Sequence, residues 1–447
     1  MGKTVGLVSL GCDKNLINSE QMLWKLMDAG YEVLEVAELA EIVIINTCAF
    51  IEAAKTEAIE NILEIAAAKK VNRIDGVGGN VEKIIVCGCL SERYREEIIK
   101  EIPEIDALVG TGSFDEIVRV VDEVAEGKNP CVFGDINAQP EEGARFLTGQ
   151  EHTAHIKIAE GCDNRCAYCV IPSLRGRYRS RRLESIVEEA KDLAENGVRE
   201  LILVAQDVTN YGFDLYGRQA LPELLDELCA IEKVRWVRLH YLYPERLTDE
   251  IIAAIKRNDK ALRYLDIPIQ HINDGILKRM NRRSTSDSVK KLINKLRGEL
   301  EGVRIRTSII AGLPGEGEAE FTELCEFLKE YKLERAGFFA FSPEEGAPAA
   351  EMEDIPDGEV TARRVEILYG IQQRVMDEYN ETCVGAVFDV ICEGYDNIIE
   401  YYFGRTYADA PDIDGKVFFK SAEPVRTGEI CEVFIEGTLD GDLLGRA

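Results

Sequence analysis

The chain has 447 residues, of which 82 are acidic and 53 are basic, giving a formal net charge of −29 at pH 7. At about 100–200 residues per domain, this length predicts two to four domains. No apolar run reaches the roughly 18 residues of a membrane span, and the N-terminus lacks the pattern of a secretory signal. We therefore expect a cytoplasmic protein with no membrane partner, whose 13 cysteines indicate metal or redox chemistry rather than disulfides.

Apolar strands alternate with helical patterns in the first part of the chain. The expected strands cover 3–10, 41–46 and 83–87, and the expected helices cover 16–29, 50–69 and 91–101. Such alternation predicts a parallel α/β sheet. We assign residues 1–135 to this N-terminal domain and the aperiodic residues 136–150 to a linker.

The central part has a longer repeat. Strand candidates begin near residues 155, 200, 236, 264, 305 and 336, with helical patterns between them. Six such βα units predict a (β/α)6 partial barrel, which we place at 151–380. Residues 384–447 instead predict a small all-β barrel of the OB type, with 13 acidic and 5 basic residues, a net charge of −8.

The loop after the first central strand carries the strongest motif. In GCDNRCAYC, Cys162, Cys166 and Cys169 form a C-x3-C-x2-C pattern. A 4Fe–4S cluster normally takes four cysteines, so three would leave one iron open. A zinc loop or buried structural cysteines are the alternatives, although no fourth zinc ligand lies at a matching spacing.

With its aromatic residue before the last cysteine, this motif resembles the radical S-adenosylmethionine (SAM) superfamily. The resemblance implies that the open iron binds SAM and that reductive cleavage of SAM yields a 5′-deoxyadenosyl radical. It also implies a set of SAM contacts, each of which has a strand cap or tight turn as its alternative role. These residues are Tyr168, Gln206, Asp207, Ser308, Gly312 and Glu316.

A second group of cysteines is spread along the N-terminal domain. Cys12, Cys48 and Cys89 each follow a predicted strand. Because the carboxyl ends of parallel strands share one edge of a sheet, these three could meet. Three separately buried thiols remain the alternative.

The order of motifs resembles the methylthiotransferase family of radical SAM enzymes along nearly the whole chain. The matching segments are SLGC, NTCAF, GCL, GCDNRCAYC, IPSLRGRYRSR and a C-terminal barrel of the TRAM type. This resemblance implies a second 4Fe–4S cluster on Cys12, Cys48 and Cys89. Cys87 could compete with Cys89, and we expect only one of the two to reach the cluster. No residue is assigned as a catalytic acid or base.

Within that family, SLGCDKNLINSE and GRTYADAPDIDG resemble the RimO-type branch, with Asn18 at a position where that branch usually has Asp. The branch implies methylthiolation of an aspartate β-carbon in the basic small-subunit ribosomal protein S twelve, using two SAM. It also implies an electron donor such as flavodoxin or ferredoxin. The acidic C-terminal barrel favours a basic protein over nucleic acid. The alternatives are a tRNA adenosine methylthiotransferase (MiaB-like) and a non-catalytic iron–sulfur or zinc-binding protein.

Two charged segments complete the sequence-based hypotheses. Five arginines within residues 175–182 could bind nucleic acid, SAM or an acidic substrate, or form salt bridges to neighbouring helices. Asp409, Asp412 and Asp414 form the densest acidic turn of the C-terminal barrel. We expect this turn to dock the basic substrate, with a merely solvated loop as the alternative.

Overall fold

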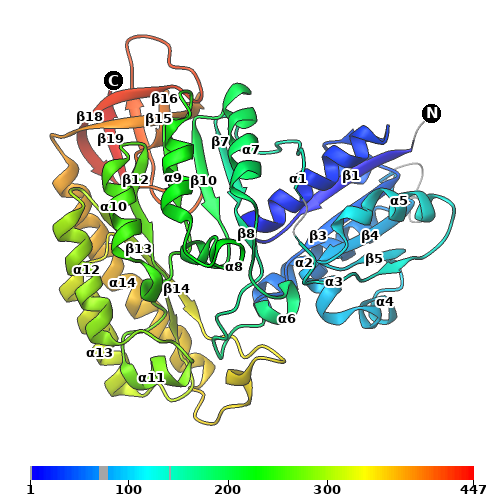
Figure 1. Cartoon of the computed structure of the whole chain (residues 1–447), viewed down its shortest axis with the longest axis horizontal. Helices are drawn as coiled ribbons and strands as arrows, with labels where there is room; N and C mark the ends of the chain where they lie inside the picture. The colour runs from blue at the N-terminus through cyan, green and yellow to red at the C-terminus, as the bar shows by residue number, and fades with distance from the viewer. Residues whose placement is uncertain (1–2, 70–78, 140–141) are drawn as a thin grey trace. The chain divides into compact units, whose positions relative to one another are not determined.

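The computed structural model describes residues 3–69, 79–139 and 142–447 (Figure 1). By their internal contacts, the residues form two compact units. The first contains Met1–Thr148, Lys157–Arg181 and Glu344–Ala347, and the second contains Gly149–Ile156, Arg182–Pro343 and Pro348–Ala447. The loop with Cys162, Cys166 and Cys169 thus belongs to the same unit as the N-terminal sheet. The domain bounds expected from the sequence stay a prediction.

The first unit is built on a six-stranded sheet of order β2-β1-β3-β4-β5-β6, with every neighbouring pair parallel. Its strands are β1 (Thr4–Ser9), β2 (Glu32–Leu34), β3 (Ile42–Thr47), β4 (Lys83–Gly88), β5 (Ala107–Val109) and β6 (Cys131–Val132). All six residues of β3 are buried, which explains the apolar run 42–45 that precedes Asn46 and Thr47. The predicted parallel α/β domain is confirmed.

Helices cover both faces of this sheet and create two separate cores. One core joins apolar residues of α1 (Asp13–Asp28) and α5 (Ile117–Ala125) to the sheet. The other joins α2 (Glu52–Ala67), α3 (Cys89–Tyr94) and α4 (Glu96–Glu101) to the opposite side. The single helix expected at 91–101 is therefore two helices, because the backbone turns at Arg95, whose φ is +47°.

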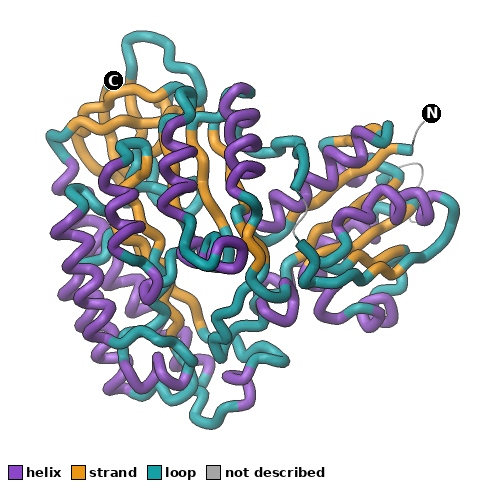
Figure 2. Tube along the Cα trace, viewed as in Figure 1, coloured by secondary structure: helices purple, strands orange, loops and turns teal. Residues whose placement is uncertain are grey.

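The second unit contains an open sheet of order β14-β13-β12-β11-β10-β7. In Figure 2 its strands are orange and the surrounding helices are purple. Its strands are β7 (Thr153–Lys157), β10 (Glu200–Val204), β11 (Trp236–Leu239), β12 (Ala261–Asp266), β13 (Arg304–Ala311) and β14 (Arg335–Ala340). The helices of this part are α7 (Leu183–Glu195), α8 (Phe213–Tyr216), α9 (Leu221–Ala230), α10 (Asp249–Arg257), α11 (Asp274–Arg279), α12 (Ser286–Glu299), α13 (Glu318–Tyr331) and α14 (Gly358–Cys383). Six strands in sequential order with intervening helices are the arrangement expected of a (β/α)6 partial barrel.

The C-terminal segment is a closed barrel of order β15-β16-β17-β19-β18. Its strands are β15 (Val387–Asp396), β16 (Tyr401–Arg405), β17 (Val417–Lys420), β18 (Ile430–Leu439) and β19 (Asp442–Arg446). Val390, Phe419 and Ile435 are fully buried in its core. The predicted all-β barrel is confirmed. Across the described residues, every helix is too short or too polar to cross a membrane.

Candidate iron–sulfur and SAM sites

The first cysteine group lies at the carboxyl edge of the N-terminal sheet. Cys12 and Cys48 follow the adjacent strands β1 and β3, and Cys89 follows β4 on the other side of β3. Gly11 packs so closely that a Cβ on it would lie 2.5 Å from the Cβ of Cys48. With its φ of +90°, this position favours glycine and lets the first two loops touch. The structure therefore places the three loops at one sheet edge, as the convergence of parallel strand ends suggested.

The thiols of this group interact electrostatically. The pKa of Cys48 is raised to about 12, chiefly by burial and also by the charges of Cys89 and Cys12, against the opposing charge of Arg175. Burial also raises the pKa of Cys89, while Arg175 lowers it. Soft sulfur donors at one sheet edge match the ligands of an iron–sulfur cluster, which binds them as thiolates. The residues present thus fit such a group.

Cys87 lies apart from this group. Its side chain is fully buried in the core formed with α1 and α5, whereas Cys89 belongs to the core on the opposite face of the sheet. β4 ends at Gly88, whose φ of +94° turns the chain so that Cys89 begins α3. On a continuous strand, residues two positions apart would instead share a face. This placement favours Cys89 as a ligand.

The second cysteine group occupies the loop between β8 (Ala159–Glu160) and α6 (Ile171–Arg175). The N–H of Cys162 donates to the carbonyl of Gly176 at 3.1 Å, which closes the loop. The Sγ atoms of Cys162 and Cys169 accept backbone N–H groups of Asn164 and Ile171, both at 3.4 Å. Burial raises the pKa of Cys169, and nearby Cys166 and Cys162 raise it further. The short loop thus holds the three thiols together, and two of its backbone N–H groups donate to their sulfur atoms.

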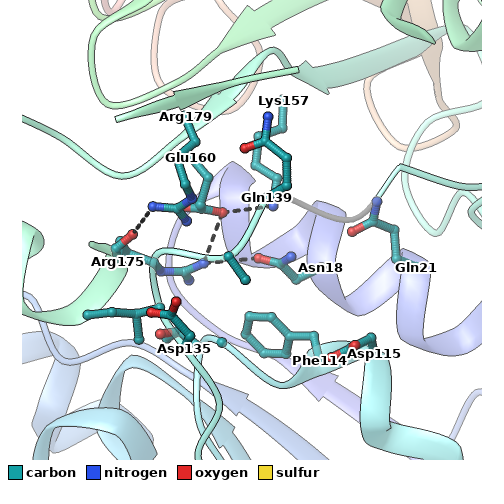
Figure 3. A pocket seen from close by; sticks show the side chains of 14 residues that line it. Asn18, Gln21, Phe114, Asp115, Asp135, Gln139, Lys157, Glu160, Arg175 and Arg179 are labelled. Carbon is teal, nitrogen blue, oxygen red and sulfur yellow. Dashed lines mark hydrogen bonds and ion pairs between the residues drawn. The ribbon is translucent and has the colours of Figure 1, made fainter. Parts of the chain in front are cut away.

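A network of buried charges lies beside this loop, at a cavity of the first unit (Figure 3). Glu160 accepts from Lys157 at 2.9 Å and from Arg175 at 3.4 Å. Burial alone would raise the pKa of Glu160, but the charges of Lys157 and Arg175 hold it well below its usual range. Lys157 and Glu160 were not among the expected site residues. Their signal was two opposite charges within an apolar strand pattern, which indicates a buried ion pair.

The arginine run is not one basic surface. Arg175 and Arg181 are buried, and Arg181 donates to the carbonyl of Lys157 at 3.0 Å, whereas Arg177 and Arg182 are exposed. Of the roles considered for this run, Arg175 has that of a salt-bridge residue, with Glu160 as its partner.

The expected SAM contacts fall in both units. Tyr168 is part of the cysteine loop of the first unit, and the other five are in the second. Gln206 and Asp207 follow β10, Ser308 lies within β13, and Gly312 and Glu316 follow β13. These strand ends share one edge of the parallel sheet.

Two of these residues already have strong protein partners. The carboxylate of Asp207 accepts from Thr209 and, at 2.7 Å, from Arg246. Glu316 accepts the N–H of Gly312 at 3.0 Å and Arg364 at 2.8 Å. Glu316 thereby holds the turn at Gly312, whose φ is +80°. All six SAM contacts stay predictions.

The prediction that an acidic turn of the C-terminal barrel docks the substrate is wrong for Asp409 and Asp414. Asp409 is 2% exposed and pairs with Arg335 of β14 at 2.6 Å. Asp414 accepts the hydroxyl of Tyr264 at 2.6 Å, and burial raises its pKa. Only Asp412 is exposed. The turn is acidic because it faces a buried arginine rather than a partner.

Comparisons with known proteins agree with this arrangement. Family models match over residues 4–110 (Uncharacterized protein family UPF0004), 156–328 (Radical SAM superfamily) and 384–447 (TRAM domain). Among solved structures, the radical SAM methyltransferase TsrM from Kitasatospora setae, described with cobalamin and a [4Fe-4S] cluster bound, is similar with a TM-score of 0.54. It is 15% identical, over 87% of this chain and 77% of that one, so it supports the fold alone.

Curated relatives match over the full length. The ribosomal protein uS12 methylthiotransferase RimO of Acetivibrio thermocellus is 45% identical over 100% of this chain and 98% of that relative. Proteins of the same name from Lachnoclostridium phytofermentans and Caldanaerobacter subterraneus subsp. tengcongensis are 46% and 44% identical, over 98% and 99% of this chain and 99% of each relative. This chain therefore belongs to the RimO family of methylthiotransferases in the radical SAM superfamily.

Proposed function

We propose that this chain adds a methylthio group to the β-carbon of an aspartate of ribosomal protein uS12. The observation that carries this proposal is the presence of two three-cysteine groups within one compact unit. Cys12, Cys48 and Cys89 meet at a sheet edge, and Cys162, Cys166 and Cys169 share one loop. Two sites of three thiols each suit two 4Fe–4S clusters that both keep an open iron. An electron carrier would instead need fully ligated clusters.

The reaction requires chemistry that ordinary side chains do not provide. A C–H bond at an aspartate β-carbon is too weakly acidic for a general base at physiological pH. When bound, the clusters and SAM would supply a carbon radical to remove that hydrogen and a site for the incoming sulfur. The chain's own residues bind and orient these groups. Six cysteines would hold the clusters, and Tyr168, Gln206, Asp207, Ser308, Gly312 and Glu316 would contact SAM.

The names of the relatives indicate uS12 as the substrate. A flavodoxin- or ferredoxin-like protein in the cytoplasm would supply electrons. The second candidate, methylthiolation of tRNA adenosine, is disfavoured by the C-terminal barrel. That barrel carries 13 acidic and only 5 basic residues, whereas phosphate contacts require Lys and Arg.

Iron counting tests the two-cluster assignment. Anaerobically purified protein should contain about eight iron atoms per chain, and Cys166→Ala should retain about four. Because the remaining cluster would be the N-terminal one, the variant should release no 5′-deoxyadenosine from SAM. Cleavage of SAM by Cys166→Ala would contradict the assignment.

A further inference from the structure

Arg175 makes an unusual set of contacts for an arginine inside a protein. It is the last residue of α6 and is only 3% exposed. Its Nε donates to the Sγ of Cys89 at 3.4 Å, and its Nη1 donates to Asn18 at 3.1 Å and to Glu160 at 3.4 Å. Its Nη2 donates to the Oδ1 of Asn15. Figure 3 shows the guanidinium between Asn18 and Glu160.

Through these partners, one guanidinium is connected to the loops of both three-cysteine groups. Asn15 connects Arg175 to two of these loops, because its Nδ2 donates to the carbonyls of Leu10 and Thr47, each at 3.0 Å. Those carbonyls lie directly before the loops of Cys12 and Cys48. On the other side, Glu160 accepts the N–H of Gly161 at 3.3 Å, at the start of the loop of Cys162.

The charge balance around Arg175 depends on Asn18. This position usually carries Asp in the branch that the sequence resembles, whereas here it offers a neutral amide oxygen. Among the described side chains that accept from Arg175, only Glu160 is a carboxylate, and Glu160 is shared with Lys157. The positive charge of Arg175 is therefore only partly balanced by a carboxylate, and it lies beside the Sγ of Cys89.

We propose that Arg175 is a positioning residue that ties the two cysteine groups together and raises the reduction potential of a cluster on Cys12, Cys48 and Cys89. This inference rests on the proposed function, since it needs that cluster. Hydrogen bonds to sulfur and nearby positive charge both favour the reduced, more negative cluster. Burial strengthens both effects because little water screens them.

The test is a redox titration of the N-terminal cluster, followed by electron paramagnetic resonance. The full chain carries Cys162→Ala, Cys166→Ala and Cys169→Ala, so that only this cluster responds. Arg175→Gln should lower the reduced-to-oxidised ratio at a fixed potential by about tenfold, which equals about 59 mV for one electron. Asn18→Asp should shift the ratio in the same direction by less. Arg177→Gln is the matched control, because it removes an exposed charge from the same run and should change nothing.

The outcomes separate the possible failures. An unchanged potential in fully loaded Arg175→Gln would overturn the proposal. Should Arg175→Gln lose iron, the variant is repeated with all six cysteines present. Loss of about half the iron, at an unchanged melting temperature and with recovery in Arg175→Lys, would support a positioning role. Loss of both clusters with a lower melting temperature would overturn it in favour of a purely structural role. A lack of N-terminal iron in the parent chain would instead refute the two-cluster function.

Discussion

Cys87 and Cys89 are one residue apart and yet belong to different environments. Cys89 begins α3 beside Arg175, while Cys87 is the second-last residue of β4 and lies in a fully buried core on the other face. Burial raises the pKa of the Cys87 thiol, with Arg175 opposing and Cys89 adding to the effect. The chemistry at this sheet edge therefore depends on which residue of the pair follows the strand.

We expect Cys89→Ala to lose the N-terminal cluster and Cys87→Ala to keep it. Removing Cys89 deletes a ligand, whereas removing Cys87 deletes one buried sulfur and should cost about 1 kcal/mol of stability. Iron and sulfide content measures the first effect, and urea unfolding measures the second. Exchanged phenotypes would show that the ligand is Cys87, two residues earlier in the chain.

His152 provides a pH-dependent contribution to stability. It is 3% exposed, and burial, followed by the charge of Arg405, lowers its pKa to about 4 against the opposing charges of Glu200 and Glu151. Its unfolded pKa is about 6.5, so protons bind the unfolded state more tightly. The stabilisation is complete above about pH 6.5 and is lost as the pH falls towards 4.

We expect wild-type protein to lose about 1–2 kcal/mol of unfolding free energy through this group between about pH 7 and 5, after allowing for screening by water. His152→Phe should remove that part of the pH dependence, because the new ring does not titrate. Urea unfolding of the metal-free protein at both pH values measures the difference. A variant that keeps the wild-type pH dependence would exclude His152 as its source.

At the scale of elements, the segment between β16 and β17 is anchored by buried charges. Asp409 pairs with Arg335 and also accepts the hydroxyl of Thr406 at 2.7 Å. In the same region, Arg405 pairs with Glu200 of β10 at 2.7 Å. These contacts join the C-terminal barrel to strands of the central sheet within the second unit.

Asp409→Ala should destabilise the second unit by about 3–5 kcal/mol, because it leaves Arg335 buried without a full counter-charge. Asp412→Asn is the control in the same turn, because it removes an exposed charge while Asn tolerates the left-handed backbone there (φ +63°), and it should change stability by less than about 0.5 kcal/mol. Thermal unfolding of both variants measures this contrast. Equal stability of the two would mean that the Asp409–Arg335 pair contributes little.

At the scale of the whole molecule, the architecture followed from periodicity and the cysteine groups from topology. Long apolar strands and adjacent parallel strand ends are local signals that translate directly into a sheet edge. Short strands were missed, since β2 and β5 have three residues each and β6 has two. The roles of Arg175 and Asp409 were not predictable, because their partners are distant in the sequence. Asn18 is 157 residues from Arg175, and Arg335 is 74 residues from Asp409. Which charged residues form buried pairs depends on the three-dimensional fold, and the local sequence pattern does not contain that information.

The most direct test is to supply the anaerobically reconstituted enzyme, SAM and a reductant with uS12 and tRNA together, and to analyse both products by mass spectrometry. The account predicts a methylthio group on the β-carbon of one uS12 aspartate, unmodified tRNA, and loss of the modification in Cys89→Ala and Cys166→Ala. A methylthio group on tRNA adenosine with unmodified uS12 would contradict it.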